Sequence, residues 1–175
     1  MKIKKRWLVS FIIICLVAVA SLFWENKNQL QQRFLATEAI NYADVAWLLT
    51  SSSFVLLMTP GLSFFYGGMV GKKNVISTML QSFISLGVVS LLWVVVGFSL
   101  SFGDSLGFEI GGSHYGIIGN PMDYLFMDNV GSLPHKQLAT TIPFVLFALF
   151  QMKFAVITPA IITGSFAERV RFIGY

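Results

Sequence analysis

Two phenylalanines, Phe150 and Phe154, are the first candidates for chemistry in this chain, and both lie inside a long apolar run. They are four residues apart, so on a helix they share one face. Two rings that point into a helical bundle could form a narrow apolar gate, or attract a small cation through their π clouds. Taken alone, the spacing favours ordinary packing against a neighbouring helix.

Lys153 lies between these two rings, near the middle of a run that is otherwise uncharged from Thr140 to Ala167. A lysine at the centre of a bilayer costs about 2.5–3.5 kcal/mol, so its side chain should face a helical bundle, a subunit contact or a water-filled cavity. From that depth the ammonium group cannot easily reach either membrane surface.

The other polar or unusual residues predict structural roles. His114 and His135 are both in a polar loop, where we expect surface histidines without a function. Gln81 should hydrogen-bond between helices, and Pro60 and Pro159 should bend the helices that contain them. We find no paired carboxylates, activated nucleophile, cofactor loop or cysteine cluster, so the sequence predicts no enzyme, no metal site and no cofactor.

The composition places most of the chain in a membrane. Of its 175 residues, 55% are hydrophobic and 11% are charged, whereas a soluble domain has about 25% charged residues. The net charge of +4 could suggest a nucleic-acid partner. The basic residues flank apolar runs instead of forming one basic face, so we expect no nucleic acid and interpret them as determinants of membrane topology.

Four apolar runs define the expected domains and helices. The first run, within residues 1–24, follows a lysine-rich start and fits a signal peptide or an N-terminal anchor. Residues 25–43 should form an extracytoplasmic segment, and residues 44–175 a membrane domain. Its helices should make an all-α, polytopic membrane bundle. They are expected at about 44–66, 75–102 and 140–167.

The positions of the positive charges predict the orientation of these helices. Lysine and arginine accumulate in cytoplasmic loops. The basic start, Lys72-Lys73 and Arg169 all lie on the cytoplasmic side if the mature N-terminus is outside. The slightly acidic loop before the last helix then lies outside as well. We therefore expect a multi-pass protein of the plasma membrane, in contact with the lipid bilayer and with its mature N-terminus outside.

Three segments carry a family resemblance. They read LLMTPGLSFFYGGMVGKKNVISTMLQSF (56–83), VVSLLWVVVGFSLSFGD (88–104) and FQMKFAVITPAIITGSFAERVRF (150–172). Together they resemble the first three transmembrane segments of the ammonium transporter family (Amt/Mep/Rh). The proline-glycine break before FYGG and the exit FAERVRF are specific in combination, and the resemblance covers roughly residues 44–175.

The resemblance implies an eleven-helix fold with an inverted repeat, assembled as a homotrimer in which each subunit has its own pore. It implies ammonium or ammonia as the substrate, with methylammonium as an analogue, and a cytosolic regulatory protein as a further partner. Phe154 would be the gate ring beneath an outer vestibule, and Phe150 would lie beside it. Lys153 stands where we would expect an uncharged residue, so we expect it to point away from the pore.

A complete member of the family is much longer than this chain, so we expect a partial sequence with the first three helices of the mature protein. Later helices would hold the two pore histidines, and His114 and His135 are not that pair. The expected function is transport of ammonium or ammonia across the plasma membrane. Two alternatives stay open: an ammonium sensor that fuses this core to a signalling domain, and a non-transporting three-helix membrane scaffold.

Overall fold

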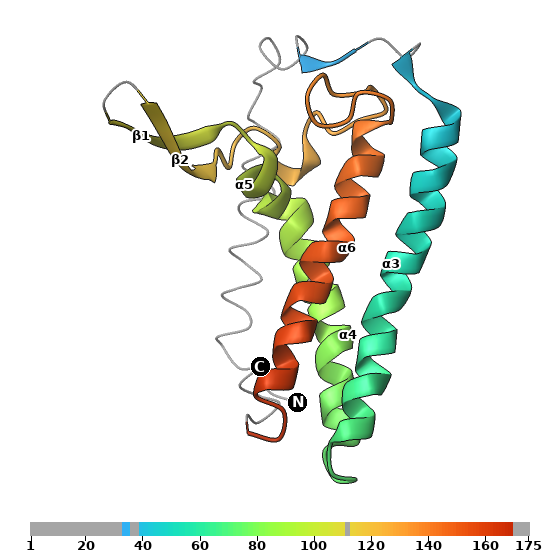
Figure 1. Cartoon of the computed structure of the whole chain (residues 1–175). Coiled ribbons are helices and arrows are strands. Elements are labelled where there is room, and N and C mark those ends of the chain that lie inside the picture. Colours follow the sequence, from blue (N-terminus) through green and yellow to red (C-terminus); the bar gives the residue numbers. More distant parts are fainter. Residues whose placement is uncertain (1–32, 36–38, 111–112, 170–175) are drawn as a thin grey trace, which may run out of the picture. The chain divides into compact units, whose positions relative to one another are not determined.

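A computed structural model describes residues 33–35, 39–110 and 113–169 of the chain (Figure 1). The expected signal peptide or anchor at residues 1–24 lies outside the described residues, as does most of the expected extracytoplasmic segment at 25–43.

The described residues form two compact units. The helical unit holds the described residues of 34–94 and 130–175. The hairpin unit holds Arg33 and residues 95–129.

Among the described residues, three helices are long and apolar enough to cross a membrane, which confirms the expected helical membrane bundle. The second of them is continuous from Val75 to Phe102 but contains a π-helical turn, Trp93–Gly97, that divides it. The third ends in a 3-10 turn, Thr163–Ser165. The helices are α3 (Tyr42–Met69), α4 (Val75–Leu92), α5 (Phe98–Phe102) and α6 (Phe144–Ile162).

The ends of α6 differ from the expected 140–167. Pro143 precedes the helix in an extended conformation, with φ −55° and ψ 135°. A proline disfavours the helical conformation of the residue before it, so the helix cannot include Ile142. At the other end the chain tightens into the 3-10 turn and leaves helical geometry at Phe166. The α-helix is therefore shorter than the uncharged run.

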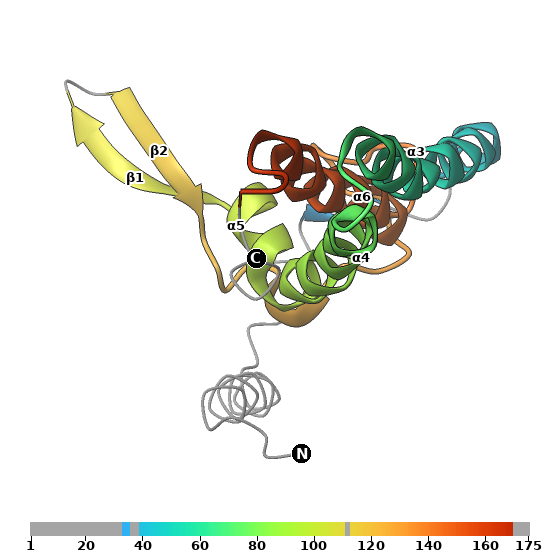
Figure 2. The same cartoon turned by 90° about the horizontal axis from the view of Figure 1, so that it is seen from below.

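The helices α3, α4 and α6 lie side by side in the helical unit and contact one another through small and hydroxyl side chains (Figures 1 and 2). Apolar side chains gain little by leaving lipid for another helix, so close backbone approach and hydrogen bonds hold such helices together. For example, the Ser63 hydroxyl of α3 donates to the Met79 carbonyl of α4, at 3.1 Å. The buried polar side chains of α3 and α4 are Ser52, Thr59, Ser63, Thr78, Gln81, Ser82 and Ser85.

Gln81 belongs to this buried set but does not behave as expected. Its side-chain oxygen has no hydrogen-bond partner among the described residues. The interhelical bonds of this helix come instead from the Ser85 hydroxyl and the Trp93 indole group. A glutamine in an apolar run therefore predicted burial correctly but not the bonds that join the helices.

One end of the helical unit, which we call the corner end (residues 66–74 and 161–169), is closed by an aromatic contact. The Tyr66 hydroxyl of α3 donates to the Ile161 carbonyl of α6, at 2.9 Å. Gly164 makes room for this ring, because a Cβ atom there would lie 2.6 Å from it. A larger side chain at Gly164 would have to displace the tyrosine.

Glu168 joins the same end to the turn between α3 and α4. One carboxylate oxygen accepts from the Gly71 amide at 2.6 Å and from the Asn74 side-chain amide at 3.1 Å. The Gly71 bond first, and the Asn74 bond second, lower the pKa of Glu168 from its ordinary value of 4.5. The carboxylate form is therefore favoured in the folded protein.

A lowered folded-state pKa gives a definite pH dependence. The stabilisation from Glu168 is fully present above its ordinary pKa and is lost as the pH falls through the lowered value. We expect thermal unfolding of the purified protein to lose stability in this acidic range, and a Glu168→Gln variant to lose this part of the pH dependence. Equal acid sensitivity in both proteins would show that the Glu168 contacts do not contribute.

His135 corrects an expectation from the sequence, because it is a buried residue and not a surface histidine. Its ring stacks on Phe144 at the start of α6, with centroids 4.7 Å apart, and meets the Phe34 ring edge-on at 5.7 Å. Its Nδ1 atom accepts from the backbone amides of Gln137 and Leu138, at 3.3 and 3.2 Å. His135 therefore organises the loop that leads into α6.

The hairpin unit adds two strands to an otherwise helical chain. β1 (Ser105–Ile110) pairs antiparallel with β2 (Ser113–Gly119), and a bulge interrupts the register between Leu106 and Gly107. The sequence predicted a polar loop here and an all-α class, which describes the membrane-spanning helices but not this hairpin. His114 lies in β2, paired with Glu109.

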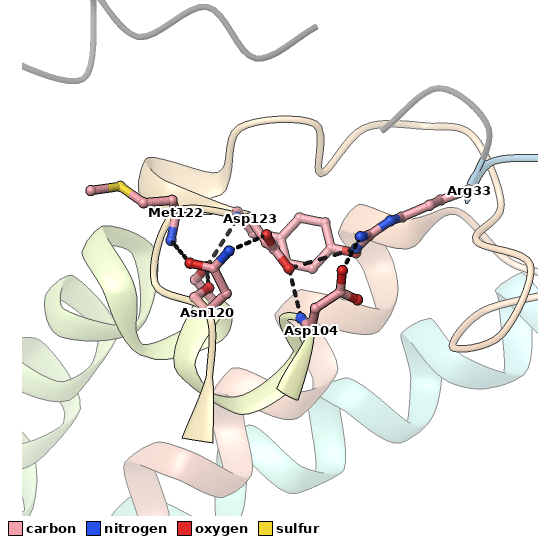
Figure 3. Close-up of polar contacts among 7 residues, drawn as sticks. Arg33, Asp104, Asn120, Met122 and Asp123 are labelled. Atoms are coloured by element: carbon pink, nitrogen blue, oxygen red, sulfur yellow. Dashed lines mark hydrogen bonds and ion pairs between the residues drawn. The ribbon is translucent and has the colours of Figure 1, made fainter. Parts of the chain in front are cut away.

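A polar cluster, which we call the clasp (Arg33, Asp104, Asn120 and Asp123), closes the base of the hairpin, as Figure 3 shows. Arg33 forms ion pairs with Asp104 and, at 3.6 Å, with Asp123. Asp123 also accepts from the Asp104 backbone amide at 2.6 Å and from the Asn120 side-chain amide at 2.9 Å. The clasp therefore ties Arg33 to both ends of the hairpin.

Candidate functional site

The structure brings Phe150 and Phe154 together on α6, with ring centroids 5.1 Å apart and ring planes at 73°. This edge-to-face geometry is a preferred arrangement of aromatic pairs. The Phe150 ring is half-buried, whereas Phe154 is 41% exposed in this chain. One ring thus supports the other while Phe154 keeps a free surface.

Two hydrogen bonds from the neighbouring helix hold the segment of α6 that carries these rings. The Trp93 indole N–H donates to the Ala148 carbonyl at 3.2 Å, and the Ser85 hydroxyl donates to the Val156 carbonyl at 3.1 Å. Both bonds are buried. Their acceptors lie two residues before Phe150 and two residues after Phe154, so the ring pair is fixed from both sides.

A proline follows the ring pair within the same helix. Pro159 lacks an amide hydrogen, which removes the hydrogen bond that the Ala155 carbonyl would otherwise accept in an α-helix. The Thr158 hydroxyl donates to the Phe154 carbonyl at 2.8 Å, so a side chain supplements the backbone at this point.

Lys153 lies next to the exposed ring but on another side of the helix. Consecutive residues of an α-helix differ by about 100° in direction, so Lys153 and Phe154 diverge. The Lys153 side chain is partly exposed and turns back one helical turn toward the exposed Leu149, away from the buried Val156 and Ile157 that follow it. Its ammonium group donates to the Leu149 carbonyl at 3.3 Å.

The chemistry available to this arrangement is that of an exposed aromatic face in apolar surroundings. An exposed phenylalanine can attract a small cation through its ring, and a pair of rings can exclude larger or hydrated species. Within the three spanning helices the sequence places charge only at Asp44 and Lys153. The described part of the site therefore contains no carboxylate near the rings that could neutralise a bound cation.

Comparison with known proteins decides which family this arrangement belongs to. A sequence model of the Ammonium Transporter Family matches residues 46–175. The chain belongs to the ammonium transporter family. The resemblance of the three motifs described above is thereby confirmed.

Individual relatives agree with this assignment. The chain is 42% identical over 142 residues to an ammonium transporter of Mycobacterium tuberculosis H37Rv, covering 74% of this chain and 28% of the relative. It is 45% identical over 131 residues to an ammonium transporter of Bacillus subtilis, covering 74% and 29%. The crystal structure of Saccharomyces cerevisiae Mep2 is similar with a TM-score of 0.59 and 28% identity, covering 83% of this chain and 30% of Mep2. The chain thus spans less than a third of the length of these proteins.

The site contains residues that the sequence did not single out. The sequence placed Phe150 and Phe154 on one helix face, and the structure shows them in contact. Trp93 and Ser85 were missed, although they fix the segment between Ala148 and Val156. Their signal was weak: an indole and a hydroxyl inside an apolar helix must find hydrogen-bond partners, but nothing in the sequence says which carbonyl they reach.

Proposed function

We propose that the protein to which this chain belongs transports ammonium or ammonia across the plasma membrane. The observation that carries this proposal is the ring pair of Phe150 and Phe154, held between two interhelical hydrogen bonds in a chain of the ammonium transporter family. Phe154 acts as the gate ring of the conduction path, and Phe150 supports it from the vestibule side. The protein is a transporter and not an enzyme.

The finer features of the proposal concern assembly and orientation. The mature N-terminus lies outside, and Lys72, Lys73 and Arg169 face the cytoplasm, in agreement with the excess of basic residues in cytoplasmic loops. The transporter works as a homotrimer, and a cytosolic protein regulates it. The resemblance to the family supports these two statements.

Uptake measurements test the proposed function and separate it from the two alternatives. The longest natural product of the reading frame that contains this chain is expressed in a bacterial strain without ammonium uptake of its own, and entry of radiolabelled methylammonium is measured. We expect saturable uptake above the level of the empty strain. A correctly inserted product that gives no uptake would contradict transport and leave the sensor or the scaffold.

The 175 residues expressed by themselves form the second arm of that experiment. The chain spans 28–30% of the curated relatives cited above and of Mep2. In the proposal, the conduction path uses further helices in addition to those described here. Uptake by the 175 residues alone would show instead that the described helices are sufficient.

Lys153 provides a prediction within the same assay. A cation that faced the conduction path would repel ammonium, so we infer that this ammonium group, which bonds to the Leu149 carbonyl, points away from that path. A Lys153→Met variant keeps the length of the stem and removes the charge. We expect methylammonium uptake within about twofold of the wild type, since a factor of two corresponds to only about 0.4 kcal/mol.

The result for Lys153→Met is interpreted together with assembly. Size-exclusion chromatography of the purified variant shows whether it assembles as the wild type does. Loss of uptake in a normally assembled variant would place the lysine in the conduction path and refute the inference.

A further inference from the structure

One face of the β1–β2 hairpin is apolar and exposed. Its four side chains are 48–52% exposed: Leu106, Phe108, Tyr115 and Ile118. The register pairs Leu106 with Ile118 and Phe108 with Tyr115, and directly paired residues project to the same side of a sheet. The two aromatic rings stack with centroids 5.9 Å apart. These four side chains form a continuous surface, which we call the apolar face.

The opposite side of the hairpin is different. Alternation along β1 and β2 places Ser105, Gly107, Gly116 and Gly119 there, together with the paired positions Glu109 and His114 near the turn. A two-stranded ribbon cannot bury an apolar face against itself, so it needs another surface for that purpose. The contrast between the two sides of the hairpin indicates that the apolar face contacts an apolar environment.

The hairpin directly follows a membrane-spanning helix, so the apolar environment nearest to it is the lipid bilayer. Phe102 ends a helix of 28 residues that is apolar enough to cross a membrane, and β1 begins three residues later, at Ser105. Such a helix is about 42 Å long, which matches the roughly 40–45 Å of a bilayer with its headgroup regions. The base of the hairpin therefore lies at the level of the lipid headgroups.

Short hydrogen bonds keep the hairpin at that level. The Ser99 hydroxyl of α5 donates to the Asn120 carbonyl at 2.8 Å and accepts from the Tyr124 amide at 2.9 Å. The clasp adds the bond that the Asp104 backbone amide donates to the Asp123 carboxylate (Figure 3). A strand of six residues extends about 20 Å, so the whole hairpin stays within about 20 Å of its anchored base.

We propose that the apolar face of the hairpin inserts into the membrane–water interface beside the end of its helix. The partner is the bilayer, and its contact zone is the boundary between headgroups and acyl chains. Aromatic side chains with a polar tip, such as Tyr115, favour this boundary. Between Ser105 and Gly119 the sequence contains one carboxylate, Glu109, and one histidine, His114, both near the hairpin turn, and no lysine or arginine. This inference depends on the membrane-spanning helix and not on the transported substrate.

The size of the face argues against a second copy of the chain as the partner. A fully buried aromatic side chain covers about 150–250 Å², so four half-exposed apolar side chains offer roughly 400 Å². A stable protein interface needs about 800 Å² from each partner. Insertion into lipid requires no such minimum area, because the helix that precedes the hairpin is already anchored in the membrane.

Spin labels test the proposal in the longest natural product that contains this chain. Cys15 is replaced by serine, and single cysteines are introduced as Phe108→Cys and Tyr115→Cys on the apolar face. Ser105→Cys on the opposite side is the matched control. The labelled proteins are reconstituted into vesicles of phosphatidylethanolamine and phosphatidylglycerol. Electron paramagnetic resonance then measures how accessible each label is to oxygen, which enters lipid, and to a water-soluble nickel chelate.

We expect the ratio of oxygen to nickel accessibility to be several-fold higher at positions 108 and 115 than at position 105. The two positions lie on different strands, so either of them tests the face if the other variant does not fold. Labels at 108 and 115 that are reached equally well by the nickel chelate would overturn the proposal. Labels shielded from both reagents would overturn it too, because they would indicate a protein partner.

Discussion

A Phe154→Ala variant is expected to bind ammonium about 2- to 30-fold more weakly, because a cation–π contact contributes about 0.5–2 kcal/mol. Phe154 is the more exposed ring of the pair, and its position is fixed by the edge-to-face contact with Phe150. Removing the ring eliminates the aromatic surface without adding charge. The concentration of ammonium that halves methylammonium uptake measures this change.

A matched control distinguishes the proposed role from general damage. Phe83→Ala removes a ring of similar exposure, 46%, from α4. We expect this control to keep the wild-type affinity. If Phe154→Ala and the control behave alike, Phe154 has no special role in binding, and the assignment of the ring pair to the conduction path is wrong.

The second large effect is expected at Trp93, which is buried and joins the π-helical turn to α6. A Trp93→Ala variant should lose about 3–5 kcal/mol of unfolding free energy, because it combines a cavity with the loss of a hydrogen bond. Trp93→Phe keeps most of the packing and removes the indole donor to the Ala148 carbonyl. Its expected cost is about 1 kcal/mol.

Denaturant unfolding of the two Trp93 variants in the same detergent gives both values. The difference between them separates packing from hydrogen bonding. An alanine variant within about 1 kcal/mol of the wild type would contradict the view that Trp93 positions the ring-bearing segment, since truncating a packed tryptophan costs more than this.

The three spanning helices were predictable because their signal is simple. A run of uncharged residues long enough to cross a bilayer needs no partner to be recognised, and Lys72-Lys73 mark where one such run ends. The exact ends were harder to predict. The uncharged run at 140–167 continues through Pro143 and past Thr163, but the backbone cannot remain α-helical there.

The hairpin and His135 show what local patterns could not reveal. The loop after Phe102 contains many glycines and polar residues, which usually indicate irregular structure, yet Gly107 is needed where β1 passes close to the Tyr115 carbonyl. His135 looked like a surface residue in a polar loop. Its burial depends on Phe34 and Phe144, which approach it only in the folded protein.

The candidate site was only partly predictable, because contacts between helices form only in the folded protein. Spacing placed Phe150 and Phe154 on one face, and the resemblance to the family gave that face a role. The bonds from Ser85 and Trp93 depend on the register between α4 and α6. The sequence of neither helix predicts this register. Sequence therefore identified the rings, whereas the structure identified the residues that position them.

Flux through the purified protein tests the central claim most directly. The longest natural product that contains this chain is reconstituted into liposomes, an inward gradient of ammonium is imposed, and entry is followed with radiolabelled methylammonium as tracer. We predict saturable entry well above that of protein-free liposomes, reduced affinity in the Phe154→Ala variant and wild-type affinity in Phe83→Ala. Entry no faster than in protein-free liposomes, from protein shown to be folded and inserted, would contradict the proposal that this member of the family transports ammonium.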